Sequence, residues 1–216
     1  MVGQSVEPFP QDIFTEPEPS IDTLANLGPL TTLAGRWAGA TGTDVHPVVD
    51  GSETDAYVET WDLEPIDAQT NGPQIFYGLR YHQHVVKRGE VETFHDQVGY
   101  LLWEPARERV VMTLAIPRGQ VAMAEGPVAS GATTFTLRAD EDDRHAGIST
   151  NDFLDWSFRT TFWSITFRLG PGDVWAYSQT TRLEVRGRAP FDHTDAGVLH
   201  RVGAPLPNPM AARNRS

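Results

Sequence analysis

Three histidines and a glutamate lie close together in the segment RYHQHVVKRGEVETFH, which spans residues 80–95. His82 and His84 are two residues apart, and Glu90 and His95 follow within the next eleven positions. Imidazole nitrogens and carboxylate oxygens are ordinary ligands for zinc, iron and manganese. On a β-strand, residues two apart point to the same face, so the two histidines could share one ion. One interpretation is therefore a metal-dependent enzyme that uses these four residues.

The same segment resembles in part the first metal motif of the cupins, in which His-x-His is followed by Glu. The resemblance is incomplete, because Gly78 lies too close to His82 and the one Pro-x-Gly (residues 117–119) lacks the histidine that should follow it. The other interpretation places His82 and His84 on the solvent face of an amphipathic strand, with Glu90 in a hairpin turn. We therefore assign no metal ligand and no catalytic residue.

The alternation of side chains along IFYGLRYHQHVV favours the second interpretation. The apolar face of this strand should point into the core, and it holds Ile75, Tyr77, Leu79, Tyr81, Gln83 and Val85. His82 and His84 then point outward. Tyr81 and Gln83 either contact a molecule inside the protein or form a satisfied polar pair in the core.

Composition excludes several classes of partner. The chain has 29 acidic and 17 basic residues and a net charge of −12, so its surface should repel nucleic acids and anionic membranes. It has no cysteine, which excludes disulfides and thiolate chemistry and fits a cytoplasmic protein. The N-terminus does not look like a signal peptide, and no stretch approaches the ~18 to 20 apolar residues of a membrane helix. Nucleophile elbows, phosphate loops and dinucleotide fingerprints are also missing from the sequence.

The body of the chain is expected to be all-β. About ten segments rich in β-branched and aromatic residues are separated by Gly, Pro, Asp and Asn, and helical periodicity is scarce. Antiparallel strands without helical cover remove their edges by closing, which predicts a ten-stranded up-and-down barrel with room for a ligand. We expect a flexible tail over residues 1–25, a single ligand-binding barrel over residues 26–203, and a second tail over residues 204–216.

The first expected strand, LAGRWAGATGTDVHP, carries Gly35, Trp37 and Gly39, followed by Thr41 and Gly42. This resembles the Gly-x-Trp-x-Gly-x-Gly signature of the nitrobindins, as though one residue had been inserted before the last glycine. Glycines inside a strand suit a sharp bend or the close approach of a flat ligand. Trp37 could plug the barrel floor or stack on that ligand.

Further stretches extend this resemblance over most of residues 33–202. Tyr81-His82-Gln83 is similar to the family's Tyr-x-Gln, and residues 95–100 are similar to its His-x-Glu-x-Gly-Tyr. The resemblance implies a ten-stranded barrel, related in shape to fatty-acid-binding proteins, that binds ferric heme and takes part in nitric oxide and peroxynitrite chemistry. The ligand pocket is then expected to include Trp37, Tyr77, Tyr81, Gln83, His95 and Tyr100.

The C-terminal segment PFDHTDAGVLHRV bears on the heme iron. Nitrobindins carry their axial histidine in a similar stretch; aligned on Leu199, that position is occupied by Thr194, with His193 one place early. A shift of one residue turns a strand side chain to the opposite face, and His200 lies too far along the strand. Val48 also replaces a heme-contacting threonine. These changes predict a divergent nitrobindin that binds heme b weakly or not at all.

Three functions stay open at this point. The leading one is a nitrobindin-like barrel that holds a small hydrophobic or planar ligand, with heme left open as the cofactor. The second is a carrier of a lipid or other hydrophobic metabolite, and the third is the cupin-like enzyme with His82, His84, Glu90 and His95 as ligands. A homodimer is left open as the assembly.

Overall fold

The computed structural model describes residues 9–206, which form twelve β-strands and two short α-helices. The strands are β1 (Gly35–Val48), β2 (Gly51–Pro65), β3 (Gln69–Asn71), β4 (Gln74–Lys87), β5 (Thr93–Glu104), β6 (Arg109–Ile116), β7 (Gln120–Pro127), β8 (Thr134–Asp140), β9 (Ile148–Thr150), β10 (Phe158–Leu169), β11 (Val174–Val185) and β12 (Phe191–Gly203). The helices are α1 (Thr23–Asn26) and α2 (Asp152–Ser157), with 3₁₀ turns at Gly28–Leu33 and Pro105–Arg107. The predicted all-β class is confirmed.

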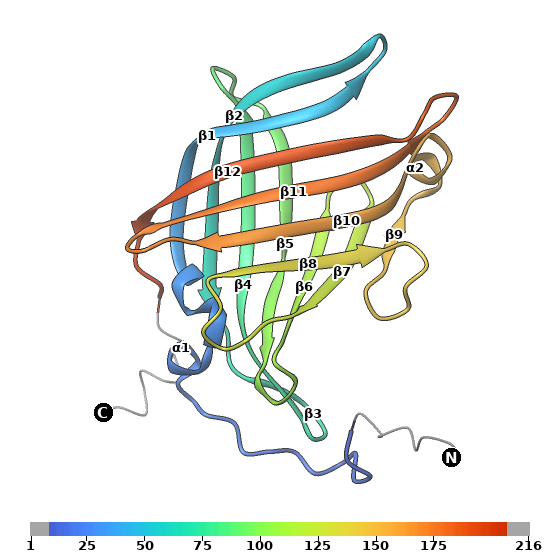
Figure 1. Ribbon diagram of the computed structural model, residues 1–216. Helices are drawn as coiled ribbons and strands as arrows, with labels where there is room; N and C mark the ends of the chain where they lie inside the picture. The colour runs from blue at the N-terminus through green and yellow to red at the C-terminus, as the bar shows by residue number, and fades with distance from the viewer. Residues whose placement is uncertain (1–8, 207–216) are drawn as a thin grey trace.

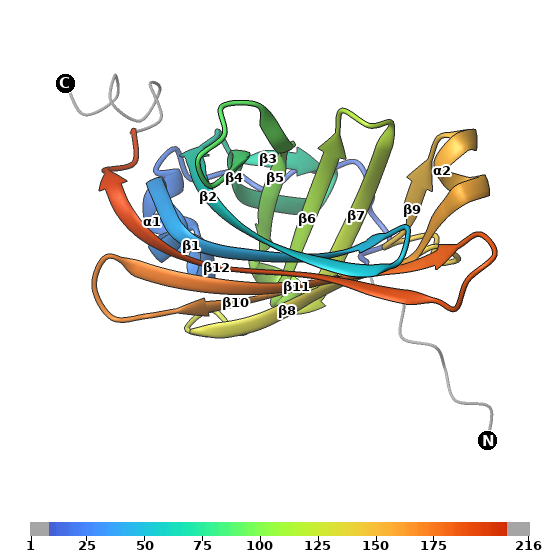
Figure 2. The ribbon, with the colours of Figure 1, turned by 90° about the horizontal axis from the view of Figure 1, so that it is seen from above.

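Ten of these strands close into an antiparallel barrel. Their order around the wall is β1, β2, β4, β5, β6, β7, β8, β10, β11 and β12, and β12 pairs again with β1. Barrel strands that follow one another along the chain are thus also neighbours in the wall, which is the predicted up-and-down arrangement. The short strands β3 and β9 add to β4 and β7. In Figure 1, β8, β10, β11 and β12 cross in front of the wall formed by β4 to β7, and Figure 2 shows the two walls from above.

The barrel wall is weakest between β7 and β8. These two strands share only the pair Glu125 and Arg138, whereas the other end of β7 pairs with β9. The segment from β9 through α2 leads directly into β10. At this end of the barrel, which we call the open end, β7 pairs with β9 in place of β8, and α2 lies beside it (Figure 1).

The other end of the barrel is closed by aromatic and leucine side chains. Trp37 is fully buried, its Nε1 donates a hydrogen bond to Leu33 O (2.8 Å), and its ring meets Trp175 edge to face. Leu27 and Leu30, just after α1, are also fully buried. Of its two expected roles, Trp37 therefore has the structural one, in the floor of the barrel.

The segment that precedes α1 contacts the barrel at few points. Residues 9–22 form no helix or strand and are mostly exposed, although Ser20 N donates to the hydroxyl of Tyr77 (3.1 Å). Close packing begins at Thr23, which is buried and donates to Ile66 O (2.6 Å). β12 ends at Gly203. Parts of both expected tails, residues 1–8 and 207–216, lie outside the described residues. Within residues 9–206, no helix is long and apolar enough to cross a membrane.

Candidate functional site

A cavity of about 400 Å³ occupies the open end of the barrel. This volume lies within the range of small-molecule sites, roughly 300 to 1,000 Å³. Most of its wall is apolar and comes from β4, β6, β10 and β11, with α2 at the rim; typical wall residues are Val85, Leu114, Ile116, Trp163 and Leu183. Four of its polar residues gather where β1 and β12 meet, whereas others, such as Arg118 and Gln120, lie elsewhere in the lining. This polar side holds Asp44, His46, His193 and Asp195.

A β-bulge in β1 turns Asp44 and His46 toward the cavity. Gly39 pairs with Glu59 and Gly42 with Tyr57, so two residues of β1 face a single residue of β2. Inward positions are odd-numbered before the bulge, as at Trp37, and even-numbered after it. The residue inserted into the glycine motif is thus accommodated by the bulge.

Gly42 fixes the position of that bulge. A Cβ on Gly42 would collide with the ring of Tyr57, which lies opposite it on β2. Thr41, at the last position of the aligned motif, is exposed on the outer side of the bulge. The close approach that the motif requires therefore occurs at Gly42 and involves a tyrosine of the barrel itself.

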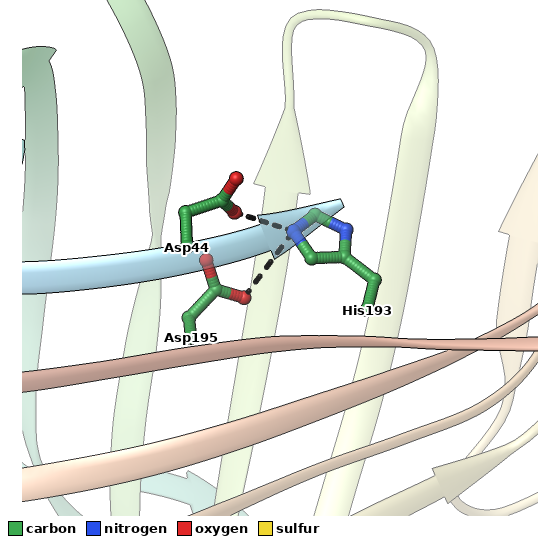
Figure 3. Close-up of side chains that lie close together, drawn as sticks. All are labelled: Asp44, His193 and Asp195. Carbon is green, nitrogen blue, oxygen red and sulfur yellow. Dashed lines mark hydrogen bonds and ion pairs between the residues drawn. The ribbon is translucent and has the colours of Figure 1, made fainter. Parts of the chain in front are cut away.

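The strand β12 brings His193 and Asp195 to the same place. Asp195 pairs directly with Asp44 across β1 and β12, and β12 pairs with β11 without a register shift. His193 Nε2 lies 2.5 Å from Asp44 Oδ1 and 3.7 Å from Asp195 Oδ2 (Figure 3). The second oxygen of Asp44 lies 2.5 Å from His46 Nδ1. Asp44 is 1 % exposed and holds one imidazole on each oxygen.

The charges of this cluster are strongly coupled. Burial alone would raise the pKa of Asp44, but the hydrogen bonds with His193 and its neighbours hold it well below its usual range. Burial would also lower the pKa of His193, but the carboxylates of Asp195 and Asp44 raise it to about 10. Burial raises the pKa of Asp195, and the adjacent Asp44 adds to this effect. The pair of Asp44 and His193 is therefore an ion pair at neutral pH, with Asp195 close beside it.

A second polar group lies beneath the cavity. Glu59 is 3 % exposed, and its Oε2 accepts hydrogen bonds from Trp61 Nε1 (2.8 Å), Tyr177 Oη (2.9 Å) and Gln83 Nε2 (3.0 Å). Its other oxygen has no hydrogen-bond partner. Burial raises the pKa of Glu59 above its ordinary value despite the three donors. The Tyr57 hydroxyl, 2.7 Å from that of Tyr177, extends this network to the cavity wall.

Two of the expected pocket residues line the cavity. Gln83 and His95 both face it, because Gln83 is on the inward face of β4 and His95 pairs with the inward Val85. Burial lowers the pKa of His95, so this ring is neutral near neutral pH. The predicted faces of β4 are confirmed, with Tyr77 and Tyr81 buried on the inward side.

The other expected pocket residues lie elsewhere. Trp37, Tyr77 and Tyr81 pack in the closed end and do not line the cavity. Tyr100 is 43 % exposed on the outer wall, because it has the opposite parity in β5 to the inward residue Leu101. Including these four residues in the pocket was wrong.

The predicted orientation of His193 was also wrong. His193 lines the cavity, whereas Thr194 is not among its lining residues. In an unbroken β12, the side chains of His193, Asp195 and Leu199 lie on one common face. The alignment on Leu199 therefore assigned the axial position to Thr194, which lies on the opposite face. Val48, the last residue of β1, does not line the cavity.

The four residues of the cupin-like alternative do not converge. His82 is exposed and pairs with Asp96 (2.9 Å), and His84 Nε2 lies 3.0 Å from Thr93 Oγ1. His95 lies on the opposite, inward face of the sheet. Glu90 is exposed in the turn between β4 and β5. Among the described residues, these side chains form no common ligand set.

Sequence reasoning missed Asp44, His46, Asp195 and Glu59. Simple alternation in YVETWDL places Glu59 on the same face as Tyr57 and Trp61, so that signal was available. Alternation continued from Trp37 places Asp44 and His46 on the outer face, which is wrong. The bulge changes the inward positions of β1 from odd-numbered to even-numbered residues. The position of that bulge depends on the contact between strands and not on β1 alone.

Comparison with known proteins agrees with this architecture. A family model described as "THAP4-like, heme-binding beta-barrel domain" matches residues 26–201. The chain belongs to this family. The nitrobindin resemblance seen in the sequence is thereby confirmed. The solved structure titled "Crystal Structure of Rv2717c from M. tuberculosis" has the same fold, with a TM-score of 0.58 and 24 % sequence identity over 83 % of this chain and 96 % of that chain. No curated protein matches the chain.

The cavity fits the family's heme in one respect and not in another. Its apolar walls suit a flat, hydrophobic molecule, and heme iron in proteins is commonly held by a histidine. His193, on the strand where the sequence resemblance places the axial ligand, has its Nε2 hydrogen-bonded to Asp44. In this arrangement that nitrogen is not free for iron.

Proposed function

We propose that this chain is a small-molecule-binding barrel that holds an apolar or planar ligand at its open end and binds ferric heme weakly. The observation that carries the proposal is the contact of 2.5 Å between His193 Nε2 and Asp44 Oδ1 within an otherwise largely apolar cavity. Hydrogen bonds to charged groups contribute about 1.5 to 3 kcal/mol, which iron coordination would have to replace.

Of the described histidines, three line the cavity: His46, His95 and His193. Asp44 holds two of them, one on each carboxylate oxygen. His95 is the cavity imidazole that Asp44 does not hold, and its lowered pKa keeps it neutral. Any residual heme binding should therefore depend on His95 and not on His193.

Titration with ferric heme, followed in the Soret region, tests this proposal. We expect weak binding by the wild type, loss of the residual binding in His95→Ala, and little loss in His193→Ala. His200→Ala is the matched control, because His200 is exposed on the outer face of the same strand as His193. Tight one-to-one binding with a histidine-ligated spectrum that disappears in His193→Ala would refute the proposal.

A lipid or other hydrophobic metabolite is a second candidate ligand. The observation in its favour is α2, which lies at the rim of the cavity and exposes apolar side chains: Phe153 is 62 % exposed and Trp156 61 %. Large exposed apolar groups often mark binding surfaces. Mass spectrometry of organic extracts from the purified protein distinguishes an acyl chain from a planar molecule.

A further inference from the structure

The cluster at the junction of β1 and β12 has the composition of a metal site. Figure 3 shows Asp44, His193 and Asp195 pointing toward one another from the two paired strands. One ligand atom from each, a nitrogen and two carboxylate oxygens, lies within 4.8 Å of the others. Three donor atoms this close can reach a single ion with small side-chain movements.

The backbone positions these donors firmly. Asp44 and Asp195 are direct partners in the β-ladder, and His193 lies two residues from Asp195 on the same face. Asp44 is almost fully buried, and Gln179 Nε2 donates to Asp195 Oδ2 (3.0 Å). The donors therefore come from strands of the barrel wall, whose positions are fixed by the ladder on both sides.

A second histidine supports the central carboxylate from the other side. His46 Nδ1 lies 2.5 Å from Asp44 Oδ2, while Asp44 Oδ1 faces His193. Carboxylates that bind metals are often held in this way by a hydrogen bond to the oxygen turned away from the ion. Asp44 can thus bind an ion with Oδ1 while His46 orients it.

Electrostatics favours a cation at this point. Asp44 and Asp195 bring two carboxylates to adjacent positions in a partly buried site, where like charges repel strongly unless a proton or cation lies between them. In the structure, the imidazole of His193 lies close to both carboxylate charges, with its Nε2 2.5 Å from Asp44 Oδ1 and 3.7 Å from Asp195 Oδ2. A divalent ion would balance both.

We propose that Asp44, His193 and Asp195 bind one divalent first-row transition metal, with His46 as a positioning residue. The mixed nitrogen and oxygen donors suit Zn²⁺, Fe²⁺ or Mn²⁺. Three protein ligands leave coordination positions that face the cavity, where a bound small molecule could complete them. Unlike heme iron, a free ion would bond to Asp44 Oδ1 as well as to His193 Nε2, so it would replace the contact between these two atoms. The heme titration and the Zn²⁺ titration can therefore fail independently.

The test uses the full chain after removal of metals with a chelator. Zn²⁺ is titrated by calorimetry, and Co²⁺ is added as a spectroscopic probe of the ligand geometry. We expect one ion per chain for the wild type, loss of this binding in His193→Ala and in Asp195→Asn, and affinity roughly 10- to 100-fold lower in His46→Ala. Asp195→Asn keeps the size of the side chain and so provides the answer if His193→Ala fails to fold.

The chain supplies its own control in the outward histidines. The double variant His82→Ala, His84→Ala removes two imidazoles beside a carboxylate, Asp96, on the solvent face. It should keep the stoichiometric ion and leave the thermal midpoint nearly unchanged. The proposal is overturned if the wild type binds no stoichiometric Zn²⁺ or Co²⁺, if binding survives in Asp195→Asn, or if the outward double variant abolishes it.

Discussion

Glu59 illustrates how a single buried carboxyl can link stability to pH. Its three hydrogen-bond donors all meet one oxygen, and no described cation pairs with it. Burial raises its pKa above the ordinary value of 4.5. A carboxyl with a higher pKa in the folded state binds its proton more tightly there than in the unfolded chain. Its contribution to stability is therefore largest at low pH and declines as the pH rises through the folded pKa.

We predict that Glu59→Gln removes this part of the pH dependence. The free energy of unfolding of the wild type should fall, relative to that of the variant, between about pH 4.5 and the raised pKa of Glu59. Denaturant titrations over this range measure the difference. Glu90→Gln, in an exposed turn, is the control and should follow the wild type. Identical pH profiles for wild type and Glu59→Gln would contradict the prediction.

For single residues, the sequence predicted correctly whether a side chain points inward or outward where the strand is regular. Alternation placed Gln83 inward and His82 outward, and both predictions hold. It failed for His193, where the alignment assumed the family's spacing to Leu199. It could not locate the carboxylate that holds His193, because Asp44 lies 149 residues away in the chain.

Among the elements, β1 has the largest influence on the cavity. Its bulge between Gly39 and Gly42 lets the strand carry one extra residue and still place Gly42 opposite Tyr57. The sequence shows the inserted residue as a break in the glycine motif. How the insertion is accommodated depends on the partners of β1 on both sides, which show the same shift in register.

We predict that two single-residue deletions in β1 have very different effects. Deleting Thr41 removes the bulge and leaves Gly42 opposite Tyr57, so the barrel should keep its stability and Asp44 should stay inward. Deleting Thr43 allows regular pairing only with Thr41 opposite Tyr57, where its side chain would meet the ring. Such overpacking costs about 1 to 3 kcal/mol.

Thermal unfolding of the two deletion variants provides the comparison. Both remove a threonine from the same strand, so composition and strand length are matched. Equal losses of stability, or a greater loss on deleting Thr41, would show that Gly42 does not fix the bulge.

For the whole molecule, the class and closure of the barrel followed from general requirements. Many short apolar strands without helices must pair their edges, and ten strands in sequence order do so by closing. No pattern in the sequence indicated the weak pairing between β7 and β8, which is compensated by β9. It also did not reveal that residues around Leu27 seal one end, because those residues lie outside any strand.

We predict that removing residues 1–20 changes the thermal midpoint little. The described part of this segment, residues 9–20, is mostly exposed and makes few contacts with the barrel. Removing residues 1–30 should instead destabilise the protein strongly, because Leu27 and Leu30 are fully buried and each loss of such a side chain costs about 2 to 5 kcal/mol. A large drop in the midpoint after the shorter truncation would contradict this view.

The most direct test of the account compares heme binding by the wild type and by Asp44→Asn. Asparagine keeps the shape of residue 44 but removes the charge that holds His193 Nε2 at 2.5 Å. Losing about 1.4 kcal/mol of that interaction corresponds to a tenfold change in affinity. We therefore expect ferric heme to bind the variant at least about tenfold more tightly than it binds the wild type, with a histidine-ligated Soret spectrum. Tight binding by the wild type that is unchanged or weakened in Asp44→Asn would contradict the account.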